Sequence, residues 1–492
     1  MSRRLKTSGA HHRSRMSHDV EYNNSRMIMQ KIARLHSERL MNDVSLVVGG
    51  VEYPAHRLIL CASSQVFQVM LMNPEWSESQ ESRVVLQESE ACAAVFGHFL
   101  RYLYTGQIRM NHALVMPFLS LADKYIVKDL AELCLSYMRA HVALAAVKGQ
   151  LVGWLQYLSN CGHNAVAQEC RQFIKQNLDL VAGADDFEHF EPDVFVSLLQ
   201  ESDLVVEDEM TLYQWAVKWL NGQHARLRAA GGGSATQDDA HMQQLVREVM
   251  SHIRFPMIPP RALADLILSP LTTNEFFLDR MKIGMMYHKG QMAEACRVTG
   301  EEGGRLMFTP RLYTAGQWGT PLTVENFHAL PAYHSRTLVF SSHRALADCT
   351  DARSCEWVVD IYPKGVWFMK FYQIVWQGTV EVPECVLRTV RLSLTCNERP
   401  LGGEVRVRVA ILVRGVADRV EHTARVVTRD HRFSGADTVL NLDGLLPYER
   451  LNPPCGPAGS RGPARSPYLV GRERDCLKLH VVIVPLDRYC AS

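Results

Sequence analysis

The chain has 492 residues, of which 47% are hydrophobic and 21% charged, and its formal net charge is +1. The length predicts about three domains, and the composition is that of an ordinary globular protein. The near-neutral charge offers no bulk attraction to nucleic acid or to an acidic membrane, which argues against DNA binding. The sequence also lacks any run approaching the roughly 18 consecutive apolar residues of a membrane helix.

The cysteines and the first residues indicate the cellular compartment. The 13 cysteines contain no C-x-x-C pair, and several, such as Cys134, Cys170 and Cys396, have apolar neighbours. We therefore predict reduced, buried thiols, with a Cys349–Cys355 pair as the alternative in an oxidising compartment. Residues 1–23 are basic without the apolar core of a signal peptide, and we expect a disordered tail, with a nuclear or transit signal as the alternative. The expected location is cytoplasmic, and a nuclear one is the alternative.

The stretch from Asn42 to Phe67 predicts two strands, a tight turn between them, and helices after them. Apolar residues alternate along the first strand, as in a largely buried strand: Val44, Leu46 and Val48. Gly49-Gly50 suits a turn with positive φ, and Pro54 is predicted to end the second strand. Ser64 is placed to cap the N-terminus of a helix.

Further motifs follow in a fixed order, namely Y-x-Y-T-G at residues 102–106 and A-D-K-Y at residues 122–125. Together with D-V-x-L-x-V and A-H-R in the first stretch, they resemble the α+β BTB/POZ domain, here residues 24–140. The resemblance implies a homodimer, in which the amphipathic helix from Asn24 to Leu40 packs across a two-fold axis. The residues implied at that interface are Met27, Ile28, Asp43 and Arg57. The alternative for Asp43 and Arg57 is that both only cap local elements.

The resemblance also implies a contact with cullin-3 through the helix from Ser64 to Met72. The residues implied are Met70, Leu71, Trp76, Glu78 and Tyr125. Trp76-Ser77-Glu78 lies about one residue later than the family pattern, and the alternative is that Trp76 covers the core edge of its own domain. His56 has no second metal-ligating residue nearby at a suitable spacing, so we predict a hydrogen-bonded core histidine.

Residues 141–270 have helical periodicity almost throughout. The pattern D-L-x-V-x-x-E, which ends at Glu209, and the segment I-R-F-P-M-I-P-P at residues 253–260 resemble the all-α BACK domain. A Gly/Ser-rich stretch at residues 228–240 predicts a flexible surface loop. Residues 271–305 are predicted to be a linker.

From residue 306 to 488 the pattern becomes that of an all-β antiparallel sandwich, because apolar residues alternate in successive short segments. Strands are predicted at residues 357–363, 367–372, 387–395, 404–413, 420–427 and 478–485, and a disordered loop at 452–467. The order of the three domains resembles the small family of BTB/POZ–BACK proteins with a TRAF-like (MATH-like) C-terminal domain, typified by the insect Transport and Golgi organization BTB protein and its vertebrate relative.

The sequence contains no nucleophile elbow, zinc-protease, Walker or dinucleotide motif in a suitable context, so we predict neither an enzyme nor a cofactor or metal site. The resemblance implies a dimeric adaptor that binds cullin-3 and, through the sandwich, an unknown protein substrate for ubiquitination. The alternative is a dimeric scaffold for trafficking or signalling assemblies without cullin binding. A transcription regulator is disfavoured, because the chain has no zinc finger and no basic stripe.

Overall fold

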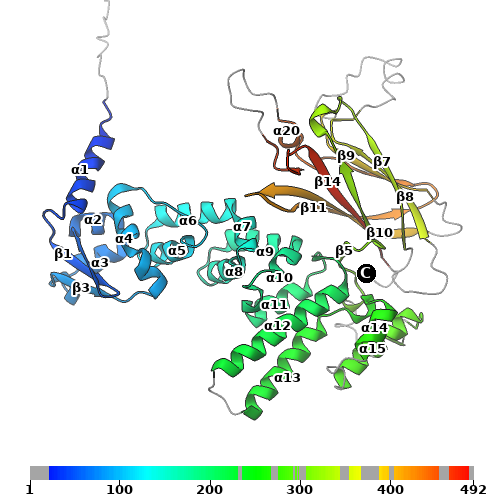
Figure 1. Cartoon of the computed structure of the whole chain (residues 1–492), viewed down its shortest axis with the longest axis horizontal. Helices are drawn as coiled ribbons and strands as arrows, with labels where there is room; N and C mark the ends of the chain where they lie inside the picture. The colour runs from blue at the N-terminus through cyan, green and yellow to red at the C-terminus, as the bar shows by residue number, and fades with distance from the viewer. Residues whose placement is uncertain are drawn as a thin grey trace, which may run out of the picture. The chain divides into compact units, whose positions relative to one another are not determined.

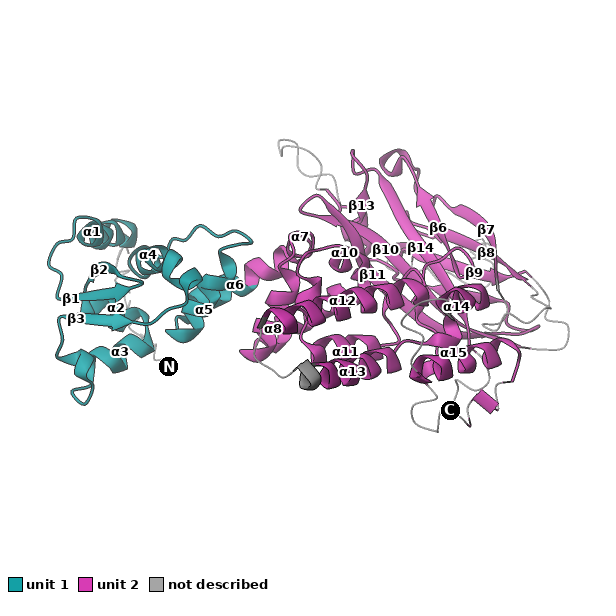
Figure 2. Ribbon diagram, turned by 60° about the horizontal axis from the view of Figure 1, so that its bottom comes forward, with its two compact units in different colours: residues 1–135 teal, residues 136–492 magenta. Residues whose placement is uncertain are grey.

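The structure is a computed structural model that describes residues 22–230, 235–267, 275–291, 294–295, 297, 306–343, 354–366, 387–397, 404–453 and 465–486. It divides into two compact units, residues 1–135 and 136–492 (Figure 2). The predicted multidomain fold class is confirmed, since helical regions precede a C-terminal antiparallel β domain (Figure 1).

Unit 1 is built on a three-stranded sheet with the order β2-β1-β3. Strands β1 (Val44–Val48) and β2 (Val51–Ala55) form a hairpin, and β3 (Arg83–Leu86) pairs with β1 in parallel. Gly49 and Gly50 turn the hairpin with φ of 56° and 81°. The prediction that Pro54 ends the second strand is wrong, because β2 is an edge strand, where the missing N–H of a proline costs no ladder hydrogen bond.

The helices of unit 1 surround this sheet, and the last of them continues into unit 2: α1 (Ser25–Ser37), α2 (Arg57–Ser63), α3 (Gln65–Met72), the 3-10 turn η1 (Ser77–Ser79), α4 (Glu90–Thr105), α5 (Val115–Lys124) and α6 (Lys128–Ala140). The predicted cap is confirmed, since the Ser64 hydroxyl oxygen accepts a hydrogen bond from the Phe67 N–H at 3.1 Å. The same hydroxyl donates to the Tyr125 carbonyl at 2.6 Å. Ser64 therefore starts α3 and also ties it to the segment that joins α5 and α6.

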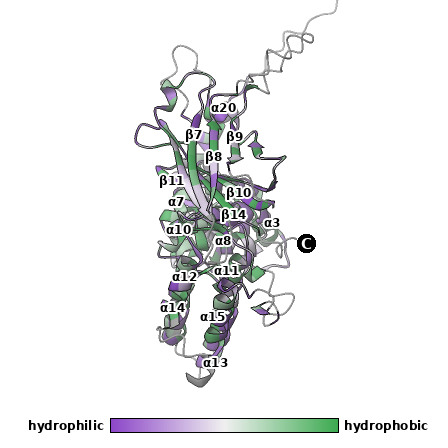
Figure 3. Cartoon of the chain, turned by 90° about the vertical axis from the view of Figure 1, so that its right-hand side faces the viewer, coloured by the Kyte–Doolittle hydropathy of each residue, from purple (hydrophilic) through white to green (hydrophobic). Residues whose placement is uncertain are grey.

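Unit 2 begins with a helical region: α7 (Val142–Val147), α8 (Leu151–Asn160), α9 (Asn164–Gln176), α10 (Leu178–Ala182), η2 (Phe187–His189), α11 (Pro192–Gln200), α12 (Glu209–Ala230), α13 (Ala235–Ser251), η3 (Phe255–Met257), α14 (Pro260–Ile267) and α15 (Glu275–His288). Helices α12 and α13 carry both hydrophobic and hydrophilic residues (Figure 3). Trp219 of α12 is fully buried, and its ring stacks on that of Phe195 of α11 at 4.6 Å between ring centroids. Among the described helices, none has the length and apolar character that crossing a membrane requires.

Two predictions about this region need correction. The stretch 228–240, predicted as a loop, is helical at both of its ends, because α12 runs to Ala230 and α13 starts at Ala235. The glycines of this stretch lie at residues 231–233, outside the described residues, whereas alanine, the strongest helix former, stands at the end of α12 and at the start of α13. The predicted linker 271–305 contains α15, whose Phe277 and Tyr287 are buried. An amphipathic helix with buried aromatic residues is part of the fold.

The C-terminal part of unit 2 is a sandwich of two antiparallel sheets, with the orders β11-β10-β14-β13, where β6 also pairs with β14, and β12-β9-β8-β7. Its strands are β6 (Gly319–Val324), β7 (Arg336–His343), β8 (Ser354–Tyr362), β9 (Arg391–Cys396), β10 (Val405–Ala417), β11 (Val420–Phe433), β12 (Val439–Leu442), β13 (Leu469–Val470) and β14 (Cys476–Pro485), and a short helix, α20 (Tyr448–Leu451), follows β12. One continuous core lies between the sheets, with Trp357, Leu392, Val409 and Val481 among its members. The predicted strand at 367–372 and residues 454–464 of the predicted loop lie outside the described residues.

The helical region and the sandwich are joined at two places. Strand β4 (Val205–Val206) pairs in parallel with β5 (Leu312–Tyr313), which leads into the sandwich. At the second place, the buried side chain of Asn177 binds the backbone of Thr423 like a neighbouring strand. Its carbonyl oxygen accepts from the Thr423 N–H at 2.6 Å, and its amide donates to the Thr423 carbonyl at 3.1 Å. Strand β11 is an edge strand of its sheet, and a β-bulge beside Thr423 shifts its register with β10.

We predict that Asn177→Ala lowers the free energy of unfolding by about 2–4 kcal/mol, because two buried backbone groups lose their partners. Urea denaturation followed by circular dichroism measures the change. The matched control is Asn160→Ala at an exposed helix end, which should change stability by less than about 0.5 kcal/mol. Equal stability of the two variants would show that the Asn177 contact does not hold the sandwich.

Candidate protein-interaction site

The first candidate surface is the face of α1 that points away from its own unit. Helix α1 packs on α4, and the ring of His36 stacks on that of Tyr104 at 4.4 Å between ring centroids. No residue of α1 is fully buried, and Met27 and Ile28 are 50% and 56% exposed. Apolar side chains that remain this exposed on an amphipathic helix are suited to contact a second apolar surface.

Asp43 and Arg57, predicted at the same interface, make their contacts inside unit 1. The Asp43 carboxylate accepts a hydrogen bond from the Arg57 backbone N–H at 2.8 Å. The Arg57 guanidinium donates to the carbonyls of Leu71 at 3.1 Å and Glu81 at 2.5 Å. These two residues form no ion pair with each other in the described structure. Both residues thus make the local contacts that the alternative predicts, and their place at a dimer interface stays a prediction.

The second candidate surface lies on α2, α3 and η1, which Arg57 holds together. Four large apolar side chains on these elements are exposed, with exposed fractions of 77%, 51%, 65% and 46%: Leu58, Val69, Met72 and Trp76. Glu78 is half-buried and accepts a hydrogen bond from the Ser77 hydroxyl at 2.9 Å. The surface thus combines an aromatic anchor, aliphatic side chains and a nearby carboxylate, as protein interfaces often do.

Met70, Leu71 and Tyr125, also predicted in the cullin contact, lie in the core of unit 1 and are at most 8% exposed. The Tyr125 ring stacks on Phe67 at 4.6 Å, and its hydroxyl donates to Glu88 at 2.5 Å. Burial, with Glu88 beside it, raises the Tyr125 pKa. Direct contact with a partner does not fit this burial. On α3 the residues at 67, 70 and 71 face inward, whereas Val69 and Met72 face outward, and helical spacing could have separated the two sets.

His56 is a hydrogen-bonded core histidine, as predicted. Its Nδ1 lies 2.8 Å from the Tyr104 hydroxyl and its Nε2 lies 2.7 Å from the Leu40 carbonyl. Nowhere among the described residues do three or more metal-ligating side chains gather into a group that could hold a metal ion.

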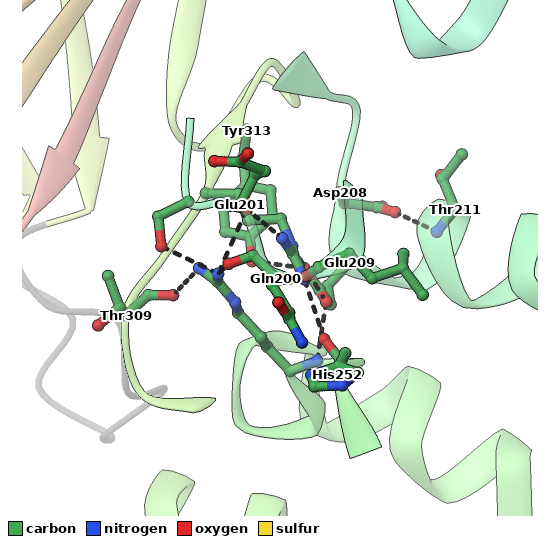
Figure 4. A network of polar contacts seen from close by, with 12 residues as sticks. Gln200, Glu201, Asp208, Glu209, Thr211, His252, Thr309 and Tyr313 are labelled. Atoms are coloured by element: carbon green, nitrogen blue, oxygen red, sulfur yellow. Dashed lines mark hydrogen bonds and ion pairs between the residues drawn. The ribbon is translucent and has the colours of Figure 1, made fainter. Parts of the chain in front are cut away.

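In unit 2, a buried polar network joins the helical region to β5 (Figure 4). The Glu209 carboxylate accepts from Arg311 Nε at 3.0 Å, from the Tyr313 hydroxyl at 2.8 Å and from the Arg254 backbone N–H at 2.8 Å. The side chains of Glu209 and Arg311 are completely buried. Arg311 also donates to the carbonyls of Leu199, at 2.7 Å, and His252, at 2.9 Å.

A second guanidinium strengthens the network. Arg254 donates to the Thr309 carbonyl at 2.5 Å and to the Ser202 hydroxyl at 3.0 Å. Burial, with Arg311 close by, lowers the Arg254 pKa to about 10, and burial beside Glu209 raises the Tyr313 pKa well above its usual value. At neutral pH Arg254 is therefore charged and Tyr313 is a hydrogen-bond donor. Glu209 and Arg254 lie in the motifs that resemble the BACK domain, but those motifs predicted no role for them, and Arg311 and Tyr313 were missed.

A groove of about 640 Å³ opens beside this network, between the loop after α11 and the strands β10 and β11. It is lined by Glu201, Ser202, Asp203, Leu312, Arg408, Thr428, Arg429 and Asp430. Each wall holds an ion pair, since Lys175 binds Asp203 at 2.7 Å and Arg408 binds Asp430 at 2.8 Å, and Arg429 donates to the Thr428 carbonyl. A groove of balanced charge suits a polar protein segment better than a small anion.

We predict that Glu209→Gln lowers the free energy of unfolding by about 3–5 kcal/mol, because the buried Arg311 guanidinium loses its carboxylate partner. Tyr313→Phe, which removes one hydrogen bond and no charge, should cost about 1 kcal/mol. Thermal and urea denaturation of unit 2 within the full chain measure both changes. A Glu209→Gln effect no larger than that of Tyr313→Phe would contradict the structural role assigned to the charge.

Comparisons with known proteins fit this architecture. The BTB/POZ domain family matches residues 33–142, the BACK family ("BTB And C-terminal Kelch") residues 151–230, and the "BTBD17 TRAF domain" family residues 308–487. These domains are typical of non-catalytic adaptors and scaffolds, and the families confirm the prediction that the chain is not an enzyme.

BTB/POZ domain-containing protein 17 of Mus musculus and that of Homo sapiens are each 31% identical to the chain over 351 residues, which cover 70% of this chain and 67% of each relative. Kelch-like protein 7 of Rattus norvegicus is 24% identical over 266 residues, covering 52% of this chain and 40% of the relative. The chain belongs to the BTB/POZ domain-containing protein 17 family.

Proposed function

We propose that the chain is a dimeric BTB–BACK adaptor that brings a target protein to a cullin-3 RING ubiquitin ligase. The observation that carries this proposal is the exposed apolar set Leu58, Val69, Met72 and Trp76 on α2, α3 and η1 of the BTB domain. Proteins with BTB and BACK domains are commonly linked to cullin-3. An aromatic anchor with aliphatic neighbours is the kind of surface on which a helical partner domain gains most of its binding energy.

The dimer in this proposal forms through α1. Met27 and Ile28 are exposed on a helix whose other face already packs on α4. In such a dimer, these side chains of one subunit would pack against the same patch of the second subunit, which is the usual geometry of a two-fold dimer. Two target sites on one dimer then raise the effective concentration of target at the ligase, and the chemistry belongs to the recruited enzymes.

The target-binding part in this proposal is the groove between the helical region and the sandwich. Its walls come from both, and its paired charges fit a polar segment of a protein. A cytoplasmic location, with a nuclear one as the alternative, also belongs to the proposal, because the adaptor would work beside an intracellular ligase. Cell fractionation tests that part.

The second candidate function is a dimeric scaffold without cullin binding. It is favoured by the burial of Met70, Leu71 and Tyr125, which the family pattern implied for the cullin contact, and by the late position of Trp76-Ser77-Glu78. The two functions share the dimer and differ in the use of the surface on α2 and α3.

We predict that the cullin-3 N-terminal domain binds the full chain, and that the double variant Met72→Glu, Trp76→Ala weakens this binding at least about tenfold, or about 1.4 kcal/mol, because the apolar anchor is lost. Light scattering should show one added cullin mass per protomer, and titration calorimetry gives the affinity. The control is Val85→Glu, another exposed apolar residue of the same domain. A chain that gains no mass at micromolar cullin contradicts the ligase function and leaves the scaffold.

We predict that the double variant Met27→Glu, Ile28→Glu converts the dimer to a monomer, because two carboxylates per subunit would be desolvated in the interface. Light scattering measures the mass. The exposed Arg26 of the same helix provides the control, since Arg26→Glu changes the charge of the helix on the side away from Met27 and Ile28. A dimer that survives the double variant would place the interface elsewhere.

A further inference from the structure

Two cysteines face each other in the core of the sandwich. Cys355 lies on β8 and Cys396 on β9, and their sulfur atoms are 3.4 Å apart. The exposed fractions of the two residues are 1% and 5%. Both belong to the core between the sheets, beside Trp357. The distance is too long for a bond but short enough for direct contact between the thiols.

The strand register explains the contact. Strands β8 and β9 pair antiparallel with Trp357 opposite Cys396, so Cys355 lies one diagonal step away on the same face. Every second residue of β8 from Cys355 onward is buried, which directs its side chain toward the opposite sheet. A disulfide has a sulfur–sulfur bond of about 2.05 Å, so the sulfurs need to approach by about 1.4 Å. Rotation of the two side chains with a small strand shift is the movement required.

We propose that Cys355 and Cys396 form an intramolecular disulfide when the chain meets a thiol oxidant of the disulfide class, such as oxidised glutathione. The thiolate of one cysteine attacks a glutathione sulfur and releases one reduced glutathione. The thiolate of the second cysteine then attacks the resulting mixed disulfide on the protein sulfur and releases another. In total, two thiols lose two protons and two electrons, and one oxidised glutathione becomes two reduced molecules.

The position of the pair gives an oxidant a route to it. Cys355 is the second residue of β8 and Cys396 is the last residue of β9. Beyond them, the next contact that holds the strands is the Asn397 N–H donating to the Glu356 carbonyl at 3.0 Å. Strand ends open locally far more often than whole domains unfold, and such opening exposes both sulfurs together. By contrast, Cys134 lies inside α6 and Cys170 inside α9, away from any strand end.

The bond would fasten β8 to β9 near one end of the four-stranded sheet and close the chain between residues 355 and 396. A cross-link of this span restricts the unfolded chain more than the folded one, so the oxidised sandwich should be the more stable form. In a reducing compartment the same residues serve as small apolar core side chains. Formation of the bond requires neither cullin binding nor the dimer.

Peptide mapping tests the site on the full chain. The protein is incubated with excess oxidised glutathione, unfolded, alkylated, digested and analysed by mass spectrometry without reduction. The expected product is one cross-linked peptide pair that joins Cys355 to Cys396, with a mass two hydrogen atoms lower than the sum of the two reduced peptides. Alkylation of both cysteines, stable glutathione adducts on them, or a cross-link to a different cysteine would overturn the proposal. This measurement needs no variant.

Variants provide the second test. The melting temperature of the wild-type chain should rise by several degrees on oxidation and return with dithiothreitol, and neither change should occur in Cys355→Ser or Cys396→Ser. Cys161→Ser, at an exposed helix end, is the matched control and should keep the full shift. A shift that persists in the Cys355 variant would assign it to another thiol and contradict the proposed pair.

Discussion

The carboxylate of Glu209 is the point at which unit 2 is held together. It lies in the first turn of α12 and is shared by Arg311, Tyr313 and the backbone of Arg254. The Arg311 guanidinium turns its other N–H donors toward the carbonyls of Leu199 and His252, at the ends of α11 and α13. The last carbonyls of a helix have no hydrogen-bond partner within the helix, and they form the negative end of the helix dipole. A buried arginine at this end supplies both the hydrogen-bond donors and the positive charge. The helical region is therefore completed by residues that arrive with β5.

This dependence has a functional consequence. The sandwich is attached to the helical region at two places. One is the Glu209 network and the other is Asn177, which lies before β4 in the chain, whereas Glu209 follows it. Two separate attachments restrict both rotation and translation of the sandwich relative to the helical region, whereas a single attachment would allow rotation. If a target segment binds in the groove beside this network, as proposed, elements that are already attached to each other reduce the binding energy lost to ordering the site. An adaptor that works by proximity gains from such stiffness, because the effective concentration of the bound target falls when a flexible linker lets it move through a larger volume.

The sequence predicted what is periodic or local and missed what depends on distant residues. The strands of the first hairpin, the Ser64 cap and the all-β end followed from alternation and capping chemistry. The family pattern placed Met70 and Leu71 in the right helix, but a motif records positions and not faces, and these two face the core. Arg311 lies 102 residues from Glu209, and no local pattern marks an isolated arginine as the partner of a distant carboxylate. Strands β6 and β7 were not predicted, because polar residues interrupt the alternation of apolar residues along them.

The apolar surface of the chain is divided unequally between the two units. Of the 20 large hydrophobic residues exposed in the described structure, 14 lie before residue 136, although unit 2 is the larger. Association through apolar faces removes such side chains from water, and a few of them contribute most of the binding free energy. Unit 2 instead presents a polar groove with an ion pair in each wall. Lasting contacts, such as those between subunits or with a ligase, thus fit unit 1. A polar groove favours selective, readily exchanged partners, which is what the target side of an adaptor requires.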